Sequence, residues 1–178
     1  MGVLCLPRGG SCILEQPAGA TFARLRVSRG YLRLSLWTNR PATEMTVAMT
    51  GVGQPQLLRF HASRPYLLEA MTEAEFELSQ CNEARCEEEL TTAWLLHFSL
   101  IRHHLGSEER INQLLNLLGS QFGSFIPDGV ALPFSLPHAR IAEMIGCTRS
   151  TVTRHLGRLK QQGLILDQES ELGLILHA

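Results

Sequence analysis

The sequence predicts an α+β fold in which a small antiparallel β-roll is followed by a long helix and then by a domain of short helices and a β-hairpin. Residues 1 to about 70 contain short runs in which apolar and polar residues alternate, as in half-buried strands. Residues 82–106 contain a long run with helical apolar spacing, and short helical runs follow it. These patterns divide the chain into residues 1–81, 82–106 and 107–178.

The composition is that of an ordinary soluble protein, with 178 residues of which 44% are hydrophobic and 19% are charged. No run approaches the roughly 20 apolar residues that span a bilayer, and we see no secretion signal at the start. The cysteines are odd in number and scattered, which argues against a disulfide framework: Cys5, Cys12, Cys81, Cys86 and Cys147. We therefore expect a cytoplasmic protein that does not bind a membrane.

Strands and turns alternate through the first part. The strand runs are Ala23–Val27, Tyr31–Trp37 and Met45–Met49. Gly30 and the segments 39–41 and 51–53 separate them as turns. Thr72-Glu-Ala-Glu75 fits a capping box, and a short helix is expected to start there.

A longer helix is expected from Asn82, as its N-cap, to Leu105, with Gly106 ending it. It carries two apolar stripes. One is expected to cover the roll and comprises Trp94, Phe98, Ile101 and Leu105. The other has the heptad spacing that suits a partner helix in a homodimer and comprises Leu90, Ala93, His97, Leu100 and His104. The alternative is that both stripes pack inside one monomer.

The C-terminal part begins with a helix that Ser107 is expected to cap and that contains Ile111, Leu114, Leu115, Leu118 and Phe122. An irregular segment, 123–135, follows, with a short strand at 130–132. Next comes a pair of helices. Ile141, Ala142 and Ile145 line the first, Gly146 breaks it, and Thr148 suits the N-cap of the second.

The second helix has a buried stripe of Val152, Leu156 and Leu159, and its other face carries arginine and hydroxyl side chains. Such a pair is the helix-turn-helix pattern, in which the second helix enters the major groove of DNA. Residues 164–166 and 172–176 form a hairpin, the wing of a winged helix domain. Residues 136–163 hold five cations and one anion, so a nearly neutral chain has a locally basic face.

From Arg110 to Ile175 the chain resembles the DNA-binding domain of the Crp/Fnr regulators. The resemblance rests on the run from Ile141 to Leu156, on Leu159 and on residues 163–165, and it is greatest to the cyanobacterial nitrogen-control branch. The resemblance implies that the N-terminal roll is a reduced form of the family's cyclic-nucleotide-binding-like sensor domain. It also implies a dimer that binds palindromic double-stranded DNA and works with RNA polymerase.

The same resemblance assigns roles on the second helix. Arg149 and Arg154 match the base-reading arginines, and Thr148 and Thr151 match residues that hold phosphates. Ser150 stands where the cyclic-AMP receptor branch has a glutamate, which implies a changed base preference. The expected DNA-binding set is Thr148, Arg149, Ser150, Thr151, Thr153, Arg154, Arg158 and Lys160. The wing carries Asp167, Glu169 and Glu171 and is not expected to clasp phosphate.

The sensor part lacks the family's phosphate cassette between Gly51 and Pro65, and in the run Leu57–His61 Arg59 is the lone candidate cation. We therefore expect no binding of cyclic AMP. The cysteine spacing does not suit an iron–sulfur cluster, and we expect neither a cofactor nor a metal.

Three other functions remain as alternatives. An enzyme would need a nucleophile, base and orienting group, and no motif places them together. The roll could belong to a dimeric interaction module that has lost specific DNA binding. The protein could also be a redox or haem sensor of the same family, through its cysteines or through His97, His103 and His104.

Overall fold

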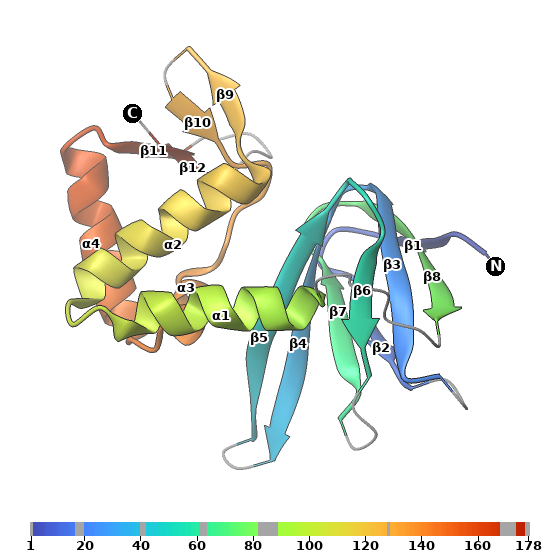
Figure 1. The fold of residues 1–178 in the computed structure, drawn as a ribbon. Helices are drawn as coiled ribbons and strands as arrows, with labels where there is room; N and C mark the ends of the chain where they lie inside the picture. The colour runs from blue at the N-terminus through green and yellow to red at the C-terminus, as the bar shows by residue number, and fades with distance from the viewer. Residues whose placement is uncertain are drawn as a thin grey trace. The chain divides into compact units, whose positions relative to one another are not determined.

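The computed structural model describes residues 2–16, 20–39, 42–60, 64–81, 89–127, 129–167 and 174–176. The chain divides into two compact units, Met1–His97 and Phe98–Ala178. The β-rich first unit and the helical second unit are drawn in Figure 1. Together they give the α+β fold that the sequence predicts: an antiparallel roll, a helix and a winged helix-turn-helix. No helix in the described part of the chain has both the length and the apolar character needed to cross a membrane.

The first unit consists of two antiparallel sheets, with strand orders β1-β8-β3-β6 and β2-β7-β4-β5. Their strands are β1 (Leu4–Leu6), β2 (Ser11–Leu14), β3 (Phe22–Arg29), β4 (Tyr31–Asn39), β5 (Ala42–Gly51), β6 (Gln56–Arg59), β7 (Tyr66–Ala70) and β8 (Ala74–Cys81).

Alternation of side chains explains these strands. In β3, Ala23, Leu25 and Val27 are buried, and the arginines between them are not. The predicted strands at 23–27, 31–37 and 45–49 lie within β3, β4 and β5 and are confirmed.

Gly30 makes the turn between β3 and β4, as predicted. Its φ is +77°, a left-handed conformation that side chains disfavour. A Cβ atom at this position would also lie 2.1 Å from the Glu73 carbonyl oxygen. Of the other two predicted turns, the one at 51–53 follows the end of β5, and residues 40 and 41 lie outside the described residues.

The short helix predicted at Thr72 is wrong, because this segment leads into β8. Ala74 and Phe76 are buried, Glu75 and Glu77 are not, and the strand pairs with β3. The Thr72 hydroxyl does not cap a helix and instead accepts a hydrogen bond from the Tyr31 N–H at 3.1 Å. The period-2 pattern of the sheet therefore outweighs the local capping signal.

Helix α1 (Leu90–His103) is shorter than predicted. The predicted cap, Asn82, lies outside the described residues, but Glu89 forms a β-bridge with Leu57 and precedes the helix. The Glu89 carboxylate accepts hydrogen bonds from the N–H groups of Thr91 (3.1 Å) and Thr92 (2.8 Å), and so caps α1. Burial of this carboxyl opposes ionisation, but the bonds from Thr92 and Thr91 outweigh it and hold the pKa of Glu89 below its usual range.

The second unit contains the remaining elements: α2 (Ser107–Phe122), β9 (Ser124–Ile126), β10 (Gly129–Ala131), α3 (His138–Ile145), α4 (Arg149–Gln161), β11 (Ile165–Asp167) and β12 (Leu174–Leu176). The last two strands pair as the predicted antiparallel wing, in a sheet of order β11-β12-β10-β9. Strand β9 was not predicted. It was also wrong to make Ser107 a cap, because Gly106 occupies the N-cap position and Ser107 is the first helical residue.

Candidate nucleic-acid interface

Helices α3 and α4 form the predicted helix-turn-helix. Gly146 ends α3 with φ +66°, in the left-handed conformation that a C-terminal cap requires. Thr148 is the N-cap of α4, and its hydroxyl accepts a hydrogen bond from the Thr151 N–H at 3.2 Å. Both capping predictions are confirmed, and together they fix the tight turn between the two helices.

One face of α4 is buried and the opposite face is open. Val152, Leu156 and Leu159 are at most 9% exposed, as predicted. The side chains of Ser150, Thr153, Arg154 and Arg158 are exposed, as is Arg149 in the first turn, whereas Thr151, Gly157 and Lys160 are half-buried. The helix therefore presents a polar, arginine-bearing surface.

Arg149 and Arg154 are the two cations that this surface leaves available. Within the described residues, neither guanidinium has a side-chain hydrogen bond or ion pair. Arg158 differs, because it forms an ion pair with Glu108 of α2. Arg149 and Arg154 are therefore the arginines of α4 whose guanidinium groups remain available as donors, and an available guanidinium has the geometry to donate two bonds to one acceptor pair.

Thr153 links this surface to α3. Its hydroxyl donates to the Arg149 carbonyl oxygen at 3.0 Å and lies 2.8 Å from Nδ1 of His138. Because the hydroxyl hydrogen is already used, the imidazole nitrogen is the donor to Thr153. His138, the first residue of α3, is thus part of the surface, and the sequence analysis missed it because the contact joins two helices.

Two arginines from other helices donate hydrogen bonds to backbone carbonyls at the C-terminal end of α3. Arg102, in the last turn of α1, donates to the carbonyl oxygens of Met144 (Nε, 2.9 Å) and Glu143 (3.1 Å). Arg110 of α2 donates to the His104 carbonyl oxygen at 2.7 Å and reaches that of Ile145 at 3.5 Å. The carbonyls of Glu143, Met144 and Ile145 lie in the last turn of α3, where a helix leaves its carbonyls without backbone partners, so the arginines stabilise this helix end. The sequence carries no signal for such contacts, because the acceptors are backbone atoms.

His155 is buried on the inner face of α4, where sequence analysis had looked only for apolar residues. It is 6% exposed, and its Nε2 lies 2.9 Å from Oδ1 of Asn112 in α2. The signal was its spacing, because His155 lies three residues after Val152 and four before Leu159.

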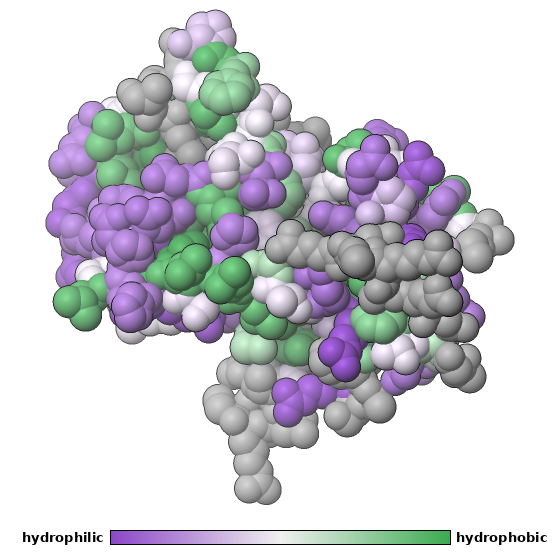
Figure 2. Space-filling view, in the orientation of Figure 1, coloured by the Kyte–Doolittle hydropathy of each residue, from purple (hydrophilic) through white to green (hydrophobic). Residues whose placement is uncertain are grey.

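The predicted dimer stripe on α1 is only partly open. Leu90 is 4% exposed and Ala93 and His97 are half-buried, whereas Leu100 (59%) and His104 are exposed. Leu96, at 59%, and Leu95, at 41%, add exposed apolar surface, and hydrophobic side chains gather over α1 in Figure 2.

In the stripe predicted to cover the roll, Trp94, Phe98 and Ile101 are buried. Leu105 is fully exposed, which was not predicted, because α1 ends before it at His103.

Arg33 and Arg59 are the two arginines of the roll that we considered as cations for binding an anionic ligand. Arg33 is fully buried and forms ion pairs with Glu44 and Glu69, and it also donates to the Thr46 hydroxyl at 3.0 Å. Arg59 is exposed, with its guanidinium 5.9 Å from the centre of the Phe22 ring. Arg33 is thus neutralised by protein carboxylates, and Arg59 lies on the surface.

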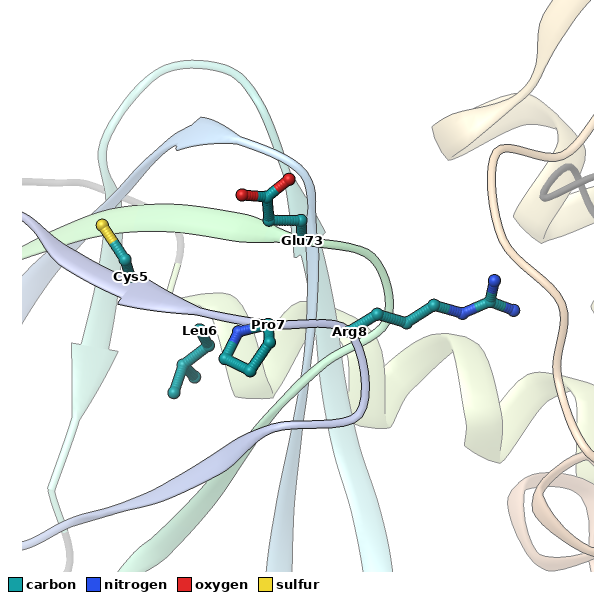
Figure 3. Close-up of a pocket in the computed structure, with 5 residues that line it drawn as sticks. All are labelled: Cys5, Leu6, Pro7, Arg8 and Glu73. Atoms are coloured by element: carbon teal, nitrogen blue, oxygen red, sulfur yellow. The ribbon is translucent and has the colours of Figure 1, made fainter.

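A pocket beside β1 is lined by Cys5, Leu6, Pro7, Arg8 and Glu73 (Figure 3). Arg8 points away from the other four side chains, and Glu73 forms an ion pair with Arg29 at 3.1 Å. Polar groups therefore do not converge on this pocket. Among the described residues, no three His, Cys, Asp or Glu side chains come together as a metal site would require, and Cys86 lies outside them.

Comparison with known proteins places this surface in a family context. Residues 109–177 match the Crp-like helix-turn-helix domain. The global nitrogen regulator of Synechococcus elongatus is 43% identical over 67 residues, which is 38% of this chain and 29% of that protein. The similarity therefore spans less than a third of the relative.

Solved structures extend the likeness in fold to almost the whole chain. A CRP-family transcriptional regulator from Thermus thermophilus has a TM-score of 0.68 at 17% identity, covering 98% of this chain and 92% of that one. FixK2 from Bradyrhizobium japonicum has a TM-score of 0.69 at 15% identity, covering 99% and 92%. At these identities the comparison establishes the fold.

Proposed function

We propose that the chain is a transcription regulator of the Crp/Fnr type that binds a specific palindromic DNA site as a dimer, and the match of residues 109–177 to the Crp-like helix-turn-helix domain supports this proposal. The observation that carries the proposal is the pair of exposed arginines, Arg149 and Arg154, on a helix whose other face is buried. A guanidinium at the open face of such a helix can donate two bonds to guanine in the major groove.

The other members of the proposed DNA-binding set have different tasks. Thr148 and Thr151 would hold phosphates and so set the position of the helix. Ser150 and Thr153 lie on the open face near the base edges. Lys160 would add phosphate attraction, as would Arg158 once it leaves Glu108.

Dimerisation through α1 is the second part of the proposal. Ala93 and Leu100 share one side of the helix, and Leu96 extends that side with exposed apolar surface. His104, also in the predicted stripe, follows directly after the last helical residue, His103. Leu90 and His97, also in the predicted stripe, would lie at the edge of that side. Two copies joined here would present two recognition helices, which suits half-sites about 34 Å apart.

We further propose that residues 1–81 act as a reduced sensor, 82–106 as the dimerisation segment and 107–178 as the DNA-binding domain, working with RNA polymerase in the cytoplasm. The boundary between the two compact units falls within α1, between His97 and Phe98.

A salt titration of DNA binding tests the proposal. The full chain is mixed with a labelled mixed-sequence duplex, and fluorescence anisotropy is followed as salt increases. We expect binding whose logarithm falls linearly with the logarithm of the salt concentration. A chain that leaves the anisotropy unchanged at low salt would instead support the interaction module that has lost DNA binding.

A further inference from the structure

A cluster of polar residues joins the recognition helix to α2, and it includes Arg158 of the proposed DNA-binding set. At its centre is His155, which is 6% exposed and has Nε2 at 2.9 Å from Oδ1 of Asn112. An amide oxygen only accepts hydrogen bonds, so Nε2 carries the hydrogen. In the neutral ring Nδ1 is then an acceptor, and among the described residues this buried atom has no hydrogen-bond partner.

Glu108 stands next to this nitrogen. One of its carboxylate oxygens lies 3.7 Å from Nδ1 of His155, and the other forms an ion pair with Arg158. A carboxylate also only accepts, so it can bond to Nδ1 only when the imidazole is protonated.

The charged groups that act on His155 within the described residues are Glu108 of α2 and Arg158 of its own helix. Burial lowers the pKa of His155 below its usual value, and Arg158 lowers it as well, while Glu108 opposes them. The lowered pKa favours the neutral ring, in which the Nδ1 acceptor faces a carboxylate acceptor.

We propose that Glu108 is an acceptor shared between His155 and Arg158, and that protonation of His155 engages Glu108 and releases Arg158 to a DNA phosphate. The inference rests on the proposed DNA binding. In this proposal His155 is a positioning residue of the recognition helix. The charge of its imidazole decides whether Arg158 is available to DNA.

Exposure of the ion pair makes this exchange feasible. The side chains of Arg158 and Glu108 are 47% and 49% exposed, and ion pairs in such positions are weak. With His155 neutral, moving Arg158 to a phosphate would leave the Glu108 carboxylate without a counter-charge beside DNA. The imidazolium supplies that charge, so DNA binding and protonation of His155 favour each other.

The test compares the full-length protein with two variants at pH 6 and pH 8. His155→Gln keeps a donor for Asn112 without a charge that titrates, and Glu108→Gln removes the carboxylate. Binding to a mixed-sequence duplex of roughly 30 base pairs, long enough for two half-sites, is measured by anisotropy at constant ionic strength. His103→Gln, an exposed histidine in the last turn of α1, is the matched control.

One additional phosphate contact raises the slope of affinity against salt by about 0.9 and the affinity itself by up to roughly eightfold at 0.1 M salt. For the natural protein and for His103→Gln, we expect this rise in DNA affinity and salt slope when the pH is lowered from 8 to 6. We expect His155→Gln to lose most of the rise in affinity on lowering the pH. We expect Glu108→Gln to have the higher affinity already at pH 8. Equal pH dependence in His155→Gln and the natural protein, or weaker binding by Glu108→Gln at pH 8, would overturn the inference.

A second measurement does not depend on the variants folding. Imidazole nitrogen resonances of the natural protein are titrated with and without the duplex, and the pKa of His155 is expected to rise when DNA is bound. If the pKa of His155 is unchanged when DNA is bound, the proposal that Glu108 is shared between His155 and Arg158 is contradicted, but the proposed function is not. Absence of DNA binding at both pH values would contradict the proposed function itself.

Discussion

Single side chains on α4 have different proposed roles, some in contacting bases and others in attracting the DNA backbone. The guanidinium groups of Arg149 and Arg154 have no hydrogen bond or ion pair among the described residues, so their donors remain available. Lys160 is half-buried and lies nearer the end of the helix. We therefore propose that the first two discriminate among bases and that the third adds charge, because only base-edge contacts carry sequence information.

Replacing Arg149 or Arg154 with alanine should lower affinity for a preferred site by roughly 1–3 kcal/mol and relax the preference at one symmetric base pair. Competition binding with single-base variants of the site measures both effects. Lys160→Ala is the control, for which we expect weaker binding to every sequence and a salt slope lower by up to about one unit. Full retention of base preference by both arginine variants would show that α4 does not read DNA.

The residues that sequence analysis placed best on α4 are those that face solvent or the apolar core. The spacing of Val152 and Leu156 predicts the buried face of the helix, and the arginines predict its exposed face. His155 and Arg158 were harder, because their roles depend on Asn112 and Glu108, which lie more than 40 residues away in the sequence. Polar contacts between helices leave no local pattern.

At the scale of elements, capping residues predicted helix ends correctly where the neighbouring residues did not also have a strand-like alternation. Gly146 and Thr148 ended α3 and began α4 as predicted. The capping box at Thr72 failed because the following residues alternate and pair with β3. The predicted start of α1 was wrong because Glu89 forms a β-bridge with Leu57, a contact that only the folded roll creates.

Loss of the Thr148 cap should destabilise the recognition helix. Thr148→Ala removes the acceptor of the Thr151 N–H, and we expect the free energy of unfolding in urea to fall by about 1 kcal/mol. Thr148→Ser keeps the hydroxyl and serves as the control, with a much smaller loss. Equal losses in the two variants would mean that the methyl group of Thr148, not its cap, matters.

At the scale of the whole molecule, α1 is the element proposed to join two copies. Leu100 is 59% exposed at the centre of the proposed contact, where burial in a dimer would remove it from water. Leu100→Glu should therefore shift sedimentation from dimer to monomer at micromolar concentration and weaken binding to a palindromic duplex.

Leu95→Glu is the matched control for dimerisation, since Leu95 is also exposed and lies about 140° away around the helix. It should leave the dimer intact. A natural protein that sediments as a monomer with palindromic DNA present would contradict dimerisation, and equal dissociation by both variants would place the contact elsewhere.

The roll should not bind cyclic AMP. Arg33 is buried against Glu44 and Glu69, and Arg59 is an exposed cation over Phe22, so neither offers an enclosed site for a phosphate. Titration calorimetry with cyclic AMP should show no binding in the micromolar range, for the natural protein and for Arg59→Ala alike. Micromolar binding that Arg59→Ala abolishes would show that the roll is a nucleotide sensor after all.

Selection of bound duplexes from a random-sequence library tests the central claim most directly. The full-length protein is used, and recovered sequences are aligned for symmetry. We predict enrichment of a palindrome whose half-sites contain a guanine and are centred about one helical turn apart, roughly 34 Å. Recovery of DNA without any enriched sequence, or of a single unpaired half-site, would contradict a dimer that reads bases through α4.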